Sequence, residues 1–568
     1  MADWTFADIW ETVTEVLPET QALVHGAVHE SWLEFNRRAD SLAQFLLSAG
    51  CRHQDKVAFN LYNGPEYLEA FAACSKASLV HVNTNYRYTD DELVYLWNDA
   101  DAVCVLFHGV FGPAVERLRS RVPRVHTWLW VDDGSGDCPP WASSYRDAVT
   151  FPSDGSVRGP WGRSGDDLVL LYTGGTTGMP KGVMWRQGDL VAVLDRNNRR
   201  RLPLESDLDH DGFSPSVRAR TEGPGPISLA ASPLMHGTGL FNAANTLTLG
   251  GSVVTMRSKR FDAAELLDTV EREGAKNIVI VGDAFAKPIL RALDEYPCRW
   301  NLSTLRLMIS SGVMWSSETK QGLLRHIPRL IMVDGFGSSE AIGMGQSVSE
   351  KDKSVSTATF TPGPDAIVLT EDGQPMKPGS GEIGRIGVRG HTPIGYYKDP
   401  VKSAATFPVI DGVRYSLPGD FATIDADGSI TLLGRGSLCI NTAGEKVFPE
   451  EVEEVLKTHP SVRDAIVVGV PDDRFGQAVI AVVETETKAD FDKGAVIDHV
   501  RERLARYKAP RDVVVVDHLG RAANGKVDYR HWTDRAAQEL NHHNVPSTVG
   551  EMKTTSGHGI AEAEPSQP

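Results

Sequence analysis

Short apolar runs alternate with amphipathic stretches in the first part of the chain. Runs at 57–62, 79–82 and 102–107 predict strands, and the segments 65–76 and 88–98 between them predict helices. Strands that alternate with helices are typical of a parallel sheet flanked by helices, with ligands at the carboxyl ends of the strands. The apolar runs are far shorter than the ~20 residues that a membrane-spanning helix needs.

The pattern changes at about residue 436. Residues 449–459 predict an acidic helix that opens with proline, and 495–506 predict a second helix. Three apolar runs predict strands at 465–468, 478–483 and 513–516. Together these elements indicate a small α+β unit of about 100 residues, which is within the usual size of a domain.

We therefore expect an α/β protein with a large N-terminal domain of stacked, mostly parallel sheets flanked by helices, and a small mobile α+β C-terminal domain. The length of 568 residues also exceeds what one hydrophobic core supports. The predicted division is 1–434 for the large domain, 435–438 for a hinge, 439–535 for the small domain and 536–568 for a disordered tail that is too polar to bury itself. The charged, Pro/Gly-rich residues 196–226 predict a surface insertion.

Charge and composition limit the classes of partner and the compartment that we expect for this protein. A formal net charge of −17 argues against nucleic acid as a main partner, because phosphate backbones are bound by basic surfaces. The six cysteines form no C-x-x-C pair, which fits a reducing cytoplasm without structural zinc. The N-terminus lacks the basic and apolar regions of a signal peptide. We expect a cytoplasmic protein with at most peripheral membrane contact, and leave the oligomeric state open, with a homodimer as one alternative.

The strongest chemical signal follows the apolar run 168–171. The chain continues there as Thr173-Gly174-Gly175-Thr176-Thr177-Gly178-Met179-Pro180-Lys181. Glycines allow backbone angles at which N–H groups converge on one anion, the hydroxyl groups add donors, and Lys181 adds a positive charge. The order does not fit the Walker form, because no glycine precedes Lys181 and no hydroxyl residue follows it. The segment predicts a phosphate-binding loop.

Further polar segments follow later apolar runs. They are Ser232-Pro233-Leu234-Met235-His236-Gly237, Ser310-Ser311-Gly312, Asp334-Gly335-Phe336-Gly337-Ser338-Ser339-Glu340, Pro418-Gly419-Asp420, Gly434-Arg435-Gly436 and Gly525-Lys526. Over residues 20–535 these segments closely resemble the acyl-adenylate-forming superfamily in order and spacing. Within it, the segments 172–186, 395–399, 412–415 and 444–451 look most like actinobacterial fatty-acid and steroid side-chain CoA ligases.

The resemblance implies two half-reactions. A carboxylate attacks the α-phosphate of ATP to give an acyl-adenylate and pyrophosphate, and the thiolate of coenzyme A then displaces AMP. ATP, Mg²⁺ and coenzyme A are therefore the expected cofactors and co-substrates, and an apolar carboxylic acid is the expected substrate. The sequence leaves a long-chain fatty acid and a steroid side-chain acid as alternatives. Small residues at likely pocket loops, Gly237, Gly239, Gly282 and Ala284, favour a bulky acyl group only weakly, since glycines also serve turns.

The resemblance also implies roles at the nucleotide site. The segment from Thr173 to Gly178, with Lys181, would hold the β- and γ-phosphates, and Thr177 would also take part in catalysis. Glu340 would be a catalytic residue and the ligand of Mg²⁺, a hard cation that prefers oxygen. The other nucleotide contacts would come from Ser311, Gly312, Asp334, Phe336, Gly337, Ser339, Asp420 and Arg435.

Three of these side chains have a specific expected contact. Phe336 would offer a flat face to adenine, Asp420 would accept both ribose hydroxyls, and Arg435 would contact the ribose or a phosphate. The family usually has Tyr at position 336 and Thr at position 339. Phe336 and Ser339 keep the aromatic ring and the hydroxyl group.

The remaining expected residues distinguish the two half-reactions. Lys526 would come from the small domain to bind the substrate carboxylate and the transferring phosphoryl group. His236 would line the acyl pocket, with a packed structural histidine as the alternative. After rotation of the small domain, Gly444 would keep the pantetheine tunnel open. Ser437 replaces the Asp or Lys that the family commonly has at the hinge, so the rate of rotation stays an open question. Ala443 replaces a more usual glycine and adds only a methyl group beside Gly444.

Three other functions fit parts of the sequence. Amino-acid-activating domains usually carry an aspartate near the His236 segment, and this chain has none there. Transfer to a carrier protein in place of coenzyme A is a second alternative. A non-catalytic nucleotide- or acyl-binding relative is the third, because fold does not fix function. The joint presence of Lys181, Glu340, Asp420 and Lys526 argues against it.

Overall fold

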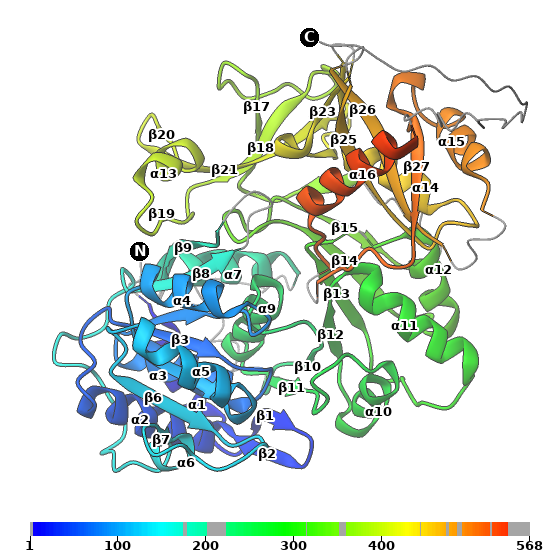
Figure 1. Cartoon of the computed structure of the whole chain (residues 1–568). Coiled ribbons are helices and arrows are strands. Elements are labelled where there is room, and N and C mark those ends of the chain that lie inside the picture. The colour runs from blue at the N-terminus through cyan, green and yellow to red at the C-terminus, as the bar shows by residue number, and fades with distance from the viewer. Residues whose placement is uncertain are drawn as a thin grey trace, which may run out of the picture.

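The protein is described by a computed structural model for residues 4–173, 179–201, 223–313, 315–351, 359–442, 445–472, 476–485, 491–522 and 525–543. The described strands form sheets of 14, 8 and 5 strands. In Figure 1 the eight-stranded sheet and the parallel strands of the 14-stranded sheet lie in the lower part of the molecule, and the five-stranded sheet lies at the upper right, beside β17 and β18 of the 14-stranded sheet. The chain passes from the 14-stranded sheet to the five-stranded sheet through the 3₁₀ helix Gly436–Leu438, which follows β22 and precedes β23.

The eight-stranded sheet has the order β19-β9-β8-β4-β3-β5-β6-β7. Its strands from β8 to β7 run parallel, whereas β9 and β19 are antiparallel additions at one edge. The strands are β3 (Lys56–Asn60), β4 (Val80–Asn83), β5 (Ala102–His108), β6 (Thr127–Val131), β7 (Ser143–Ser144), β8 (Leu168–Thr173), β9 (Lys181–Arg186) and β19 (Gly395–Tyr396).

The 14-stranded sheet has a parallel part and an antiparallel part. β1, β11, β10, β12, β13 and β14 are parallel neighbours, and every pairing from β14 to β17 is antiparallel. The parallel part, with the edge strand β2, comprises β1 (Gln21–His25), β2 (Val28–Ser31), β10 (Ile227–Ala230), β11 (Ser252–Thr255), β12 (Asn277–Ile280), β13 (Leu307–Ser311) and β14 (Ile331–Phe336). The antiparallel part comprises β15 (Gly345–Ser349), β16 (Thr359–Pro362), β17 (Ala366–Leu369), β18 (Gly384–Arg389), β20 (Val409–Ile410), β21 (Val413–Ile424) and β22 (Ile430–Arg435).

The helices form layers between and outside the two large sheets. One core lies between the sheets and is filled by α1 (Phe6–Val16), α2 (Trp32–Ser48), α3 (Pro65–Lys76) and α9 (Gly237–Thr248). A second core covers the outer face of the 14-stranded sheet with α10 (Ala263–Glu273), α11 (Gly282–Glu295) and α12 (Ser317–His326). A third covers the outer face of the eight-stranded sheet with α4 (Asp90–Asp99) and α5 (Gly112–Leu118). Three more helices are α6 (Tyr145–Ala148), α7 (Gln187–Arg201) and α13 (Pro400–Thr406).

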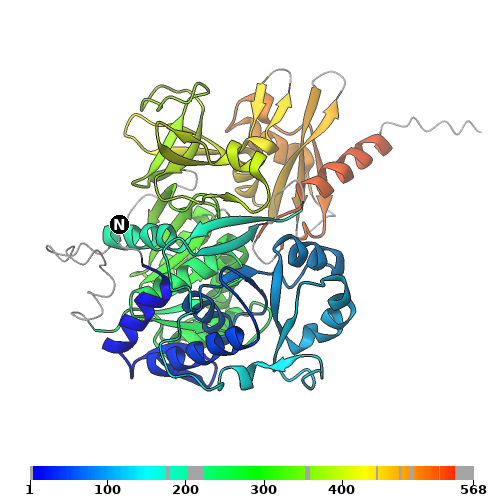
Figure 2. The ribbon, with the colours of Figure 1, turned by 90° about the vertical axis from the view of Figure 1, so that its left-hand side faces the viewer.

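The small domain contains the five-stranded sheet. Its strands are β23 (Ile440–Thr442), β24 (Glu445–Val447), β25 (Asp464–Asp472), β26 (Gly476–Glu484) and β27 (Asp512–Val516). The helices α14 (Pro449–Lys457) and α15 (Lys493–Arg501) cover one face, and α16 (Tyr529–His543) covers the other. Figure 2, turned by 90°, shows this domain on the same side of the large domain as in Figure 1.

The α/β fold class expected from the sequence is confirmed. The predicted elements at 65–76, 102–107 and 449–459 appear as α3, β5 and α14. Parallel pairing in the two large sheets covers β8 to β7 of one sheet and β14 to β1 of the other, because the chain from β15 onward adds antiparallel strands that the apolar pattern did not reveal. None of the helices in the described ranges combines the length and the apolar character needed to cross a bilayer.

Two expected segments differ from the structure or fall partly outside it. Helix α16 continues to His543, whereas the disordered tail was expected from residue 536, because Ala536 is buried against the small-domain sheet. Residues 544–568 lie outside the described ranges. In the expected insertion 196–226, residues 196–201 complete α7, and 202–222 are likewise outside.

Candidate active site

The candidate site lies at the carboxyl ends of β8, β12, β13 and β14. In the parallel register, Ser310 on β13 lies opposite Asp334 on β14, and Ser311 opposite Gly335. Gly312 follows β13 with φ of +92°, a left-handed conformation that glycine adopts without strain. The strand ends therefore bring together the segments around Ser311, Gly312, Asp334 and Phe336, as topology requires of parallel neighbours.

Some expected site residues cannot be placed. Gly174, Gly175, Thr176, Thr177, Gly178 and Gly444 lie outside the described residues, and only the backbone of Arg435 is described. Their roles stay predictions.

Two asparagines, the half-buried Asn63 and the buried Asn83, hold the segment that carries His236 by hydrogen bonds. Asn63 Nδ2 donates to the carbonyls of Ala230 (3.2 Å) and Ser232 (3.0 Å), and its Oδ1 accepts from the Leu234 amide (2.7 Å). These bonds fix the turn between β10 and α9. The turn therefore depends on a side chain from the connection between β3 and α3.

Asn83, at the end of β4, makes the second set of bonds. Its Nδ2 donates to the carbonyls of Tyr172 (2.9 Å) and Met235 (2.8 Å), and its Oδ1 accepts from the Tyr172 amide (2.6 Å). One side chain thus joins the strand that leads into the predicted phosphate-binding loop to the residue before His236. Sequence analysis did not find either asparagine, since neither lies in a motif.

Lys526 lies near His236 although the two residues belong to different domains. Burial, together with the positive charges of Lys526 and Arg87, lowers the pKa of the His236 imidazole to about 3. A Cβ atom on Gly525 would lie 2.5 Å from Val313 Cγ2 and 3.5 Å from Val281 Cγ1, so the loop before Lys526 packs against the ends of β12 and β13. The small domain thus presents Lys526 to the large domain, and His236 is neutral at physiological pH.

Arg521 holds the Lys526 loop to the small-domain sheet. Its guanidinium binds both carboxylate oxygens of Asp464, and its Nη1 donates to the Gly525 carbonyl at 2.9 Å. Burial acts to raise the pKa of Asp464, but the bonds from Arg521 and the charge of Lys457 bring it down to about 2. The loop is therefore fixed by an ion pair that sequence analysis did not find.

A buried lysine lies under the expected adenine site. The Lys320 ammonium is 3.4 Å from Asp334 Oδ2 and 5.4 Å from the centre of the Trp315 ring, and its side chain is fully buried. Burial raises the pKa of Asp334 to about 6, with the Lys320 charge acting in the opposite direction. Phe336, two residues along β14, packs against Phe360 with ring centres 5.4 Å apart.

Glu340 is held by two hydrogen bonds, one from β19 of the eight-stranded sheet and one from β21 of the 14-stranded sheet. The Tyr396 hydroxyl donates to its Oε1 at 2.9 Å, and the Ser416 hydroxyl donates to its backbone carbonyl at 2.6 Å. Nearby, the indole of Trp185 donates to the Ser339 carbonyl at 2.8 Å. Lys181, the first residue of β9, forms an ion pair with Asp399, which follows β19.

The donor set around Glu340 fits Mg²⁺. Among the described residues, no group of three or more His, Cys, Asp or Glu side chains could hold a metal ion by itself. One carboxylate is enough for Mg²⁺ that takes its other ligands from phosphates and water, which is how this ion usually binds beside nucleotides. Glu340 would be its protein ligand.

Asp420 and Arg435 lie at paired backbone positions on two adjacent strands. They are paired residues of β21 and β22, and Asp420 is buried. A Cβ atom at Gly436 would lie 2.4 Å from the Phe421 ring, so the chain between the domains passes tightly over β21. Asp420, the expected ribose contact, and the inter-domain segment are therefore adjacent in the structure.

The backbone geometry explains two of the glycines that weakly favoured a large acyl pocket, Gly239 and Gly282. A Cβ atom at Gly239 would lie 2.2 Å from the Pro233 carbonyl oxygen. Gly282 has φ of +50°, and its amide donates to Ser310 Oγ at 2.8 Å. These positions therefore give no information about the size of the acyl group.

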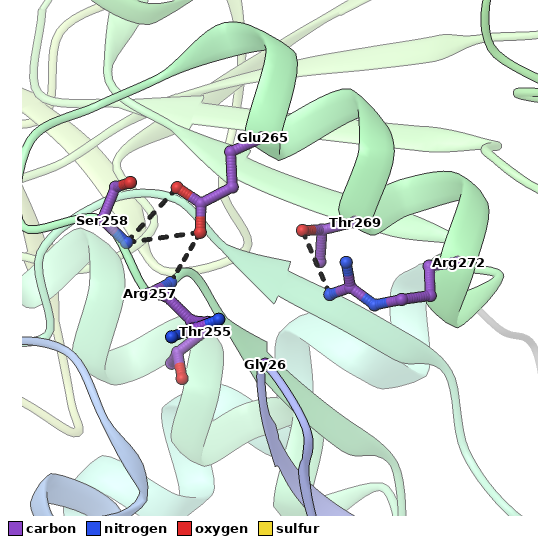
Figure 3. Close-up of a pocket in the computed structure, with 7 residues that line it drawn as sticks. All are labelled: Gly26, Thr255, Arg257, Ser258, Glu265, Thr269 and Arg272. Carbon is purple, nitrogen blue, oxygen red and sulfur yellow. Dashed lines mark hydrogen bonds between the residues drawn. The ribbon is translucent and has the colours of Figure 1, made fainter.

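A polar groove of about 540 Å³ lies apart from these residues, between the β1–β2 turn and α10 (Figure 3). Glu265 closes one side by accepting from the amides of Arg257 (2.8 Å) and Ser258 (3.3 Å). On the other side, Arg272 donates to Thr269 at 3.3 Å and to Glu273 at 2.7 Å. None of the expected site residues lines this groove.

Comparison with known families matches residues 10–397 to the AMP-binding enzymes and residues 451–526 to the C-terminal domain of the same enzymes. The chain belongs to the AMP-binding enzyme family. The resemblance on which the expected site was built is thereby confirmed.

Several known proteins are similar to this AMP-binding enzyme over most of its length. It is 36% identical to the medium-chain acyl-CoA ligase Mig of Mycobacterium avium, over 93% of this chain and 97% of that protein. It is 37% identical to a medium/long-chain-fatty-acid–CoA/3-oxocholest-4-en-26-oate–CoA ligase of Mycolicibacterium smegmatis, over 94% and 96%. The crystal structure of ATP-bound MatB from Rhodopseudomonas palustris superposes with a TM-score of 0.76 at 26% identity, covering 94% of this chain and 99% of that one.

Proposed function

We propose that this AMP-binding enzyme is an acyl-CoA synthetase that activates an apolar carboxylic acid. The observation that carries the proposal is the placement of Lys526 from the small domain near His236, against the ends of β12 and β13. The neighbouring strand β14 carries Asp334, and Glu340 follows it in the chain. A mobile ammonium beside a phosphate loop and a carboxylate suits adenylate formation, in which negative charge develops on the transferring phosphoryl group.

In the first half-reaction, a carboxylate oxygen of the acid attacks the α-phosphorus of ATP and the bond to pyrophosphate breaks. Lys526 would bind the attacking carboxylate and the α-phosphoryl oxygens, which aligns the reactants and offsets their charge. Lys181 would bind the leaving pyrophosphate. Asp420 would accept the ribose hydroxyls. Bound Mg²⁺ would supply further neutralisation of phosphate charge, held by Glu340.

In the second half-reaction, the thiolate sulfur of coenzyme A attacks the acyl carbon and AMP leaves. The small domain would first rotate about residues 435–438, which removes Lys526 and presents Gly444. We expect the protein and its reaction in the cytoplasm. A homodimer is one expected oligomeric state, and sedimentation analysis would measure it.

The names of the relatives support the substrate class. Mig is named for medium-chain acids, and the M. smegmatis ligase for medium- and long-chain fatty acids and for a cholestenoate. We therefore propose a fatty acid or a steroid side-chain acid as substrate. Ligation with coenzyme A across acids of increasing chain length, plus one steroid carboxylate, would identify the preferred class.

Product analysis tests the reaction type. We expect AMP and pyrophosphate, a requirement for Mg²⁺, and no comparable activity with GTP. ADP and phosphate as products would refute the proposal. Formation of the adenylate without transfer to coenzyme A would indicate a carrier protein as acceptor.

Separate assays of the half-reactions test the two conformations. Lys526→Ala should slow pyrophosphate exchange by roughly 10²–10³-fold, because it removes a charge contact of the first transition state. Thioester formation from synthetic acyl-adenylate should survive. Gly444→Leu should block thioester formation from synthetic acyl-adenylate and leave the first half-reaction intact. Equal damage to both half-reactions in both variants would contradict the mechanism.

A further inference from the structure

Strand β19 connects two parts of the nucleotide site that are far apart in the sequence. It pairs antiparallel with β9, so that Gly395 lies opposite Met184 and Tyr396 opposite Val183. The pairing continues with a bond from the Tyr397 amide to the Gly182 carbonyl (2.8 Å), next to Lys181. The residues that follow the phosphate loop therefore serve as the frame on which β19 is built.

The Tyr396 side chain reaches from this frame to Glu340. Its hydroxyl donates to Glu340 Oε1 at 2.9 Å, across 56 positions of sequence. The ring is buried at 4% exposure and packs against Phe407 with ring centres 5.2 Å apart, and the Tyr396 amide donates to Ser403 Oγ at 2.7 Å. The ring and the backbone of Tyr396 are thus fixed by contacts that do not depend on the bond to Glu340.

We propose that Tyr396 is a positioning residue for Glu340: it fixes the orientation of the carboxylate that binds the metal ion of the nucleotide. This rests on the proposed role of Glu340. A carboxylate has two oxygens, so a hydrogen bond to Oε1 sets the rotamer while the group keeps an oxygen for a cation. Hydrogen bonds to metal ligands commonly change metal affinity by 10- to 100-fold.

The chain offers a matched control at the next position. Tyr397 has the same chemistry and lies in the same turn, but its hydroxyl donates to Asp101 at 2.9 Å, away from Glu340. Tyr396→Phe and Tyr397→Phe each remove one hydroxyl and keep the ring. A general loosening of the turn would affect both variants, whereas loss of the bond to Glu340 affects only one.

The test measures binding of Mn²⁺ and ATP to the full-length protein by electron paramagnetic resonance, without turnover. We expect Tyr396→Phe to weaken retention of Mn²⁺ in the ATP complex about 10-fold and Tyr397→Phe to leave it unchanged. The double variant Tyr396→Phe/Glu340→Gln should bind no more weakly than Glu340→Gln alone, because Tyr396 acts only through Glu340.

The outcomes separate this proposal from the proposed function. If Glu340→Gln weakens Mn²⁺ binding but Tyr396→Phe does not, the positioning role is wrong and the role of Glu340 stands. Equal effects of Tyr396→Phe and Tyr397→Phe would also overturn the positioning role. If Glu340→Gln itself leaves Mn²⁺ binding unchanged, the metal role of Glu340 is wrong and the inference falls with it.

Discussion

Replacement of Asn83 by alanine tests how the two large sheets are joined at the site. The variant removes the bonds from Nδ2 to the carbonyls of Tyr172 and Met235, and the bond from the Tyr172 amide to Oδ1. Asn83 is 3% exposed, so water does not readily replace these bonds. Strand β8, which leads into the predicted phosphate-binding loop, and the His236 segment then lose the side chain that bonds to both.

The size of the effect follows from three buried bonds. At about 0.5–1.5 kcal/mol for each hydrogen bond, their removal costs about 1.5–4.5 kcal/mol of unfolding free energy. The groups left behind on Tyr172 and Met235 are buried and lose a partner, which places the expected loss in the upper half of that range, at about 3–4 kcal/mol. Misplacement of the two segments should also slow adenylation by up to about 10²-fold.

Urea unfolding of the large domain measures the loss of stability, and hydrogen–deuterium exchange at the Tyr172 amide shows whether it is local. Asn98→Ala is a suitable control, because Asn98 makes one surface bond, to the Arg121 carbonyl (3.0 Å). We expect that control to stay within about 0.5 kcal/mol of the parent protein. A loss for Asn83→Ala below about 1 kcal/mol, with unchanged exchange at Tyr172, would refute the reasoning.

Two further predictions concern buried charge. Lys526→Ala should raise the pKa of His236 above about 3, because it removes one of two nearby positive charges. NMR titration of labelled histidine measures the pKa of His236. The control Lys508→Ala removes a lysine paired with Glu451 and should leave the pKa of His236 unchanged. An unshifted His236 in the Lys526 variant would contradict the placement of the loop. The folded-state pKa of Asp334, about 6, lies above its ordinary value of 3.8, so stability from this group is present below pH ~3.8 and is lost as the pH rises through 6. Lys320→Met should raise that pKa further, so the variant should lose more stability in urea unfolding at pH 8 than at pH 5; an equal loss at both pH values would show that Asp334 is not the cause.

The parts of the fold that could be predicted are those with a strong local pattern. Helix α3 begins at Pro65 and ends at Lys76, as the sequence indicates, because its apolar spacing and its proline start are both local signals. Strands β16 and β17 have four residues each and are only partly buried, so alternation along them is weak. The predicted end of the small domain at residue 535 falls inside helix α16, because the buried face of this helix depends on contacts with β25, β26 and β27 that no local pattern shows.

The candidate site divides in the same way. Gly312 and Asp334 could be predicted because glycines and acids after apolar runs mark strand ends, and parallel topology brings those ends together. Asn83 and Met235 are 152 residues apart, and Arg521 and Asp464 are 57 apart. No local pattern identifies such partners, because tertiary packing alone determines which side chains meet.

Helix α16 has a consequence for how this protein is trimmed or fused to other proteins. It covers one apolar face of the five-stranded sheet, where Trp532 and Ala536 pack on strand residues such as Ile466 and Val482, and the Trp532 indole donates to the Leu519 carbonyl at 3.1 Å. A chain cut at residue 535 would lose Ala536 and the last turns of the helix, and would expose part of this face to solvent. Exposed apolar sheet faces promote aggregation. Expression designs should therefore retain the chain through His543 and place tags beyond it.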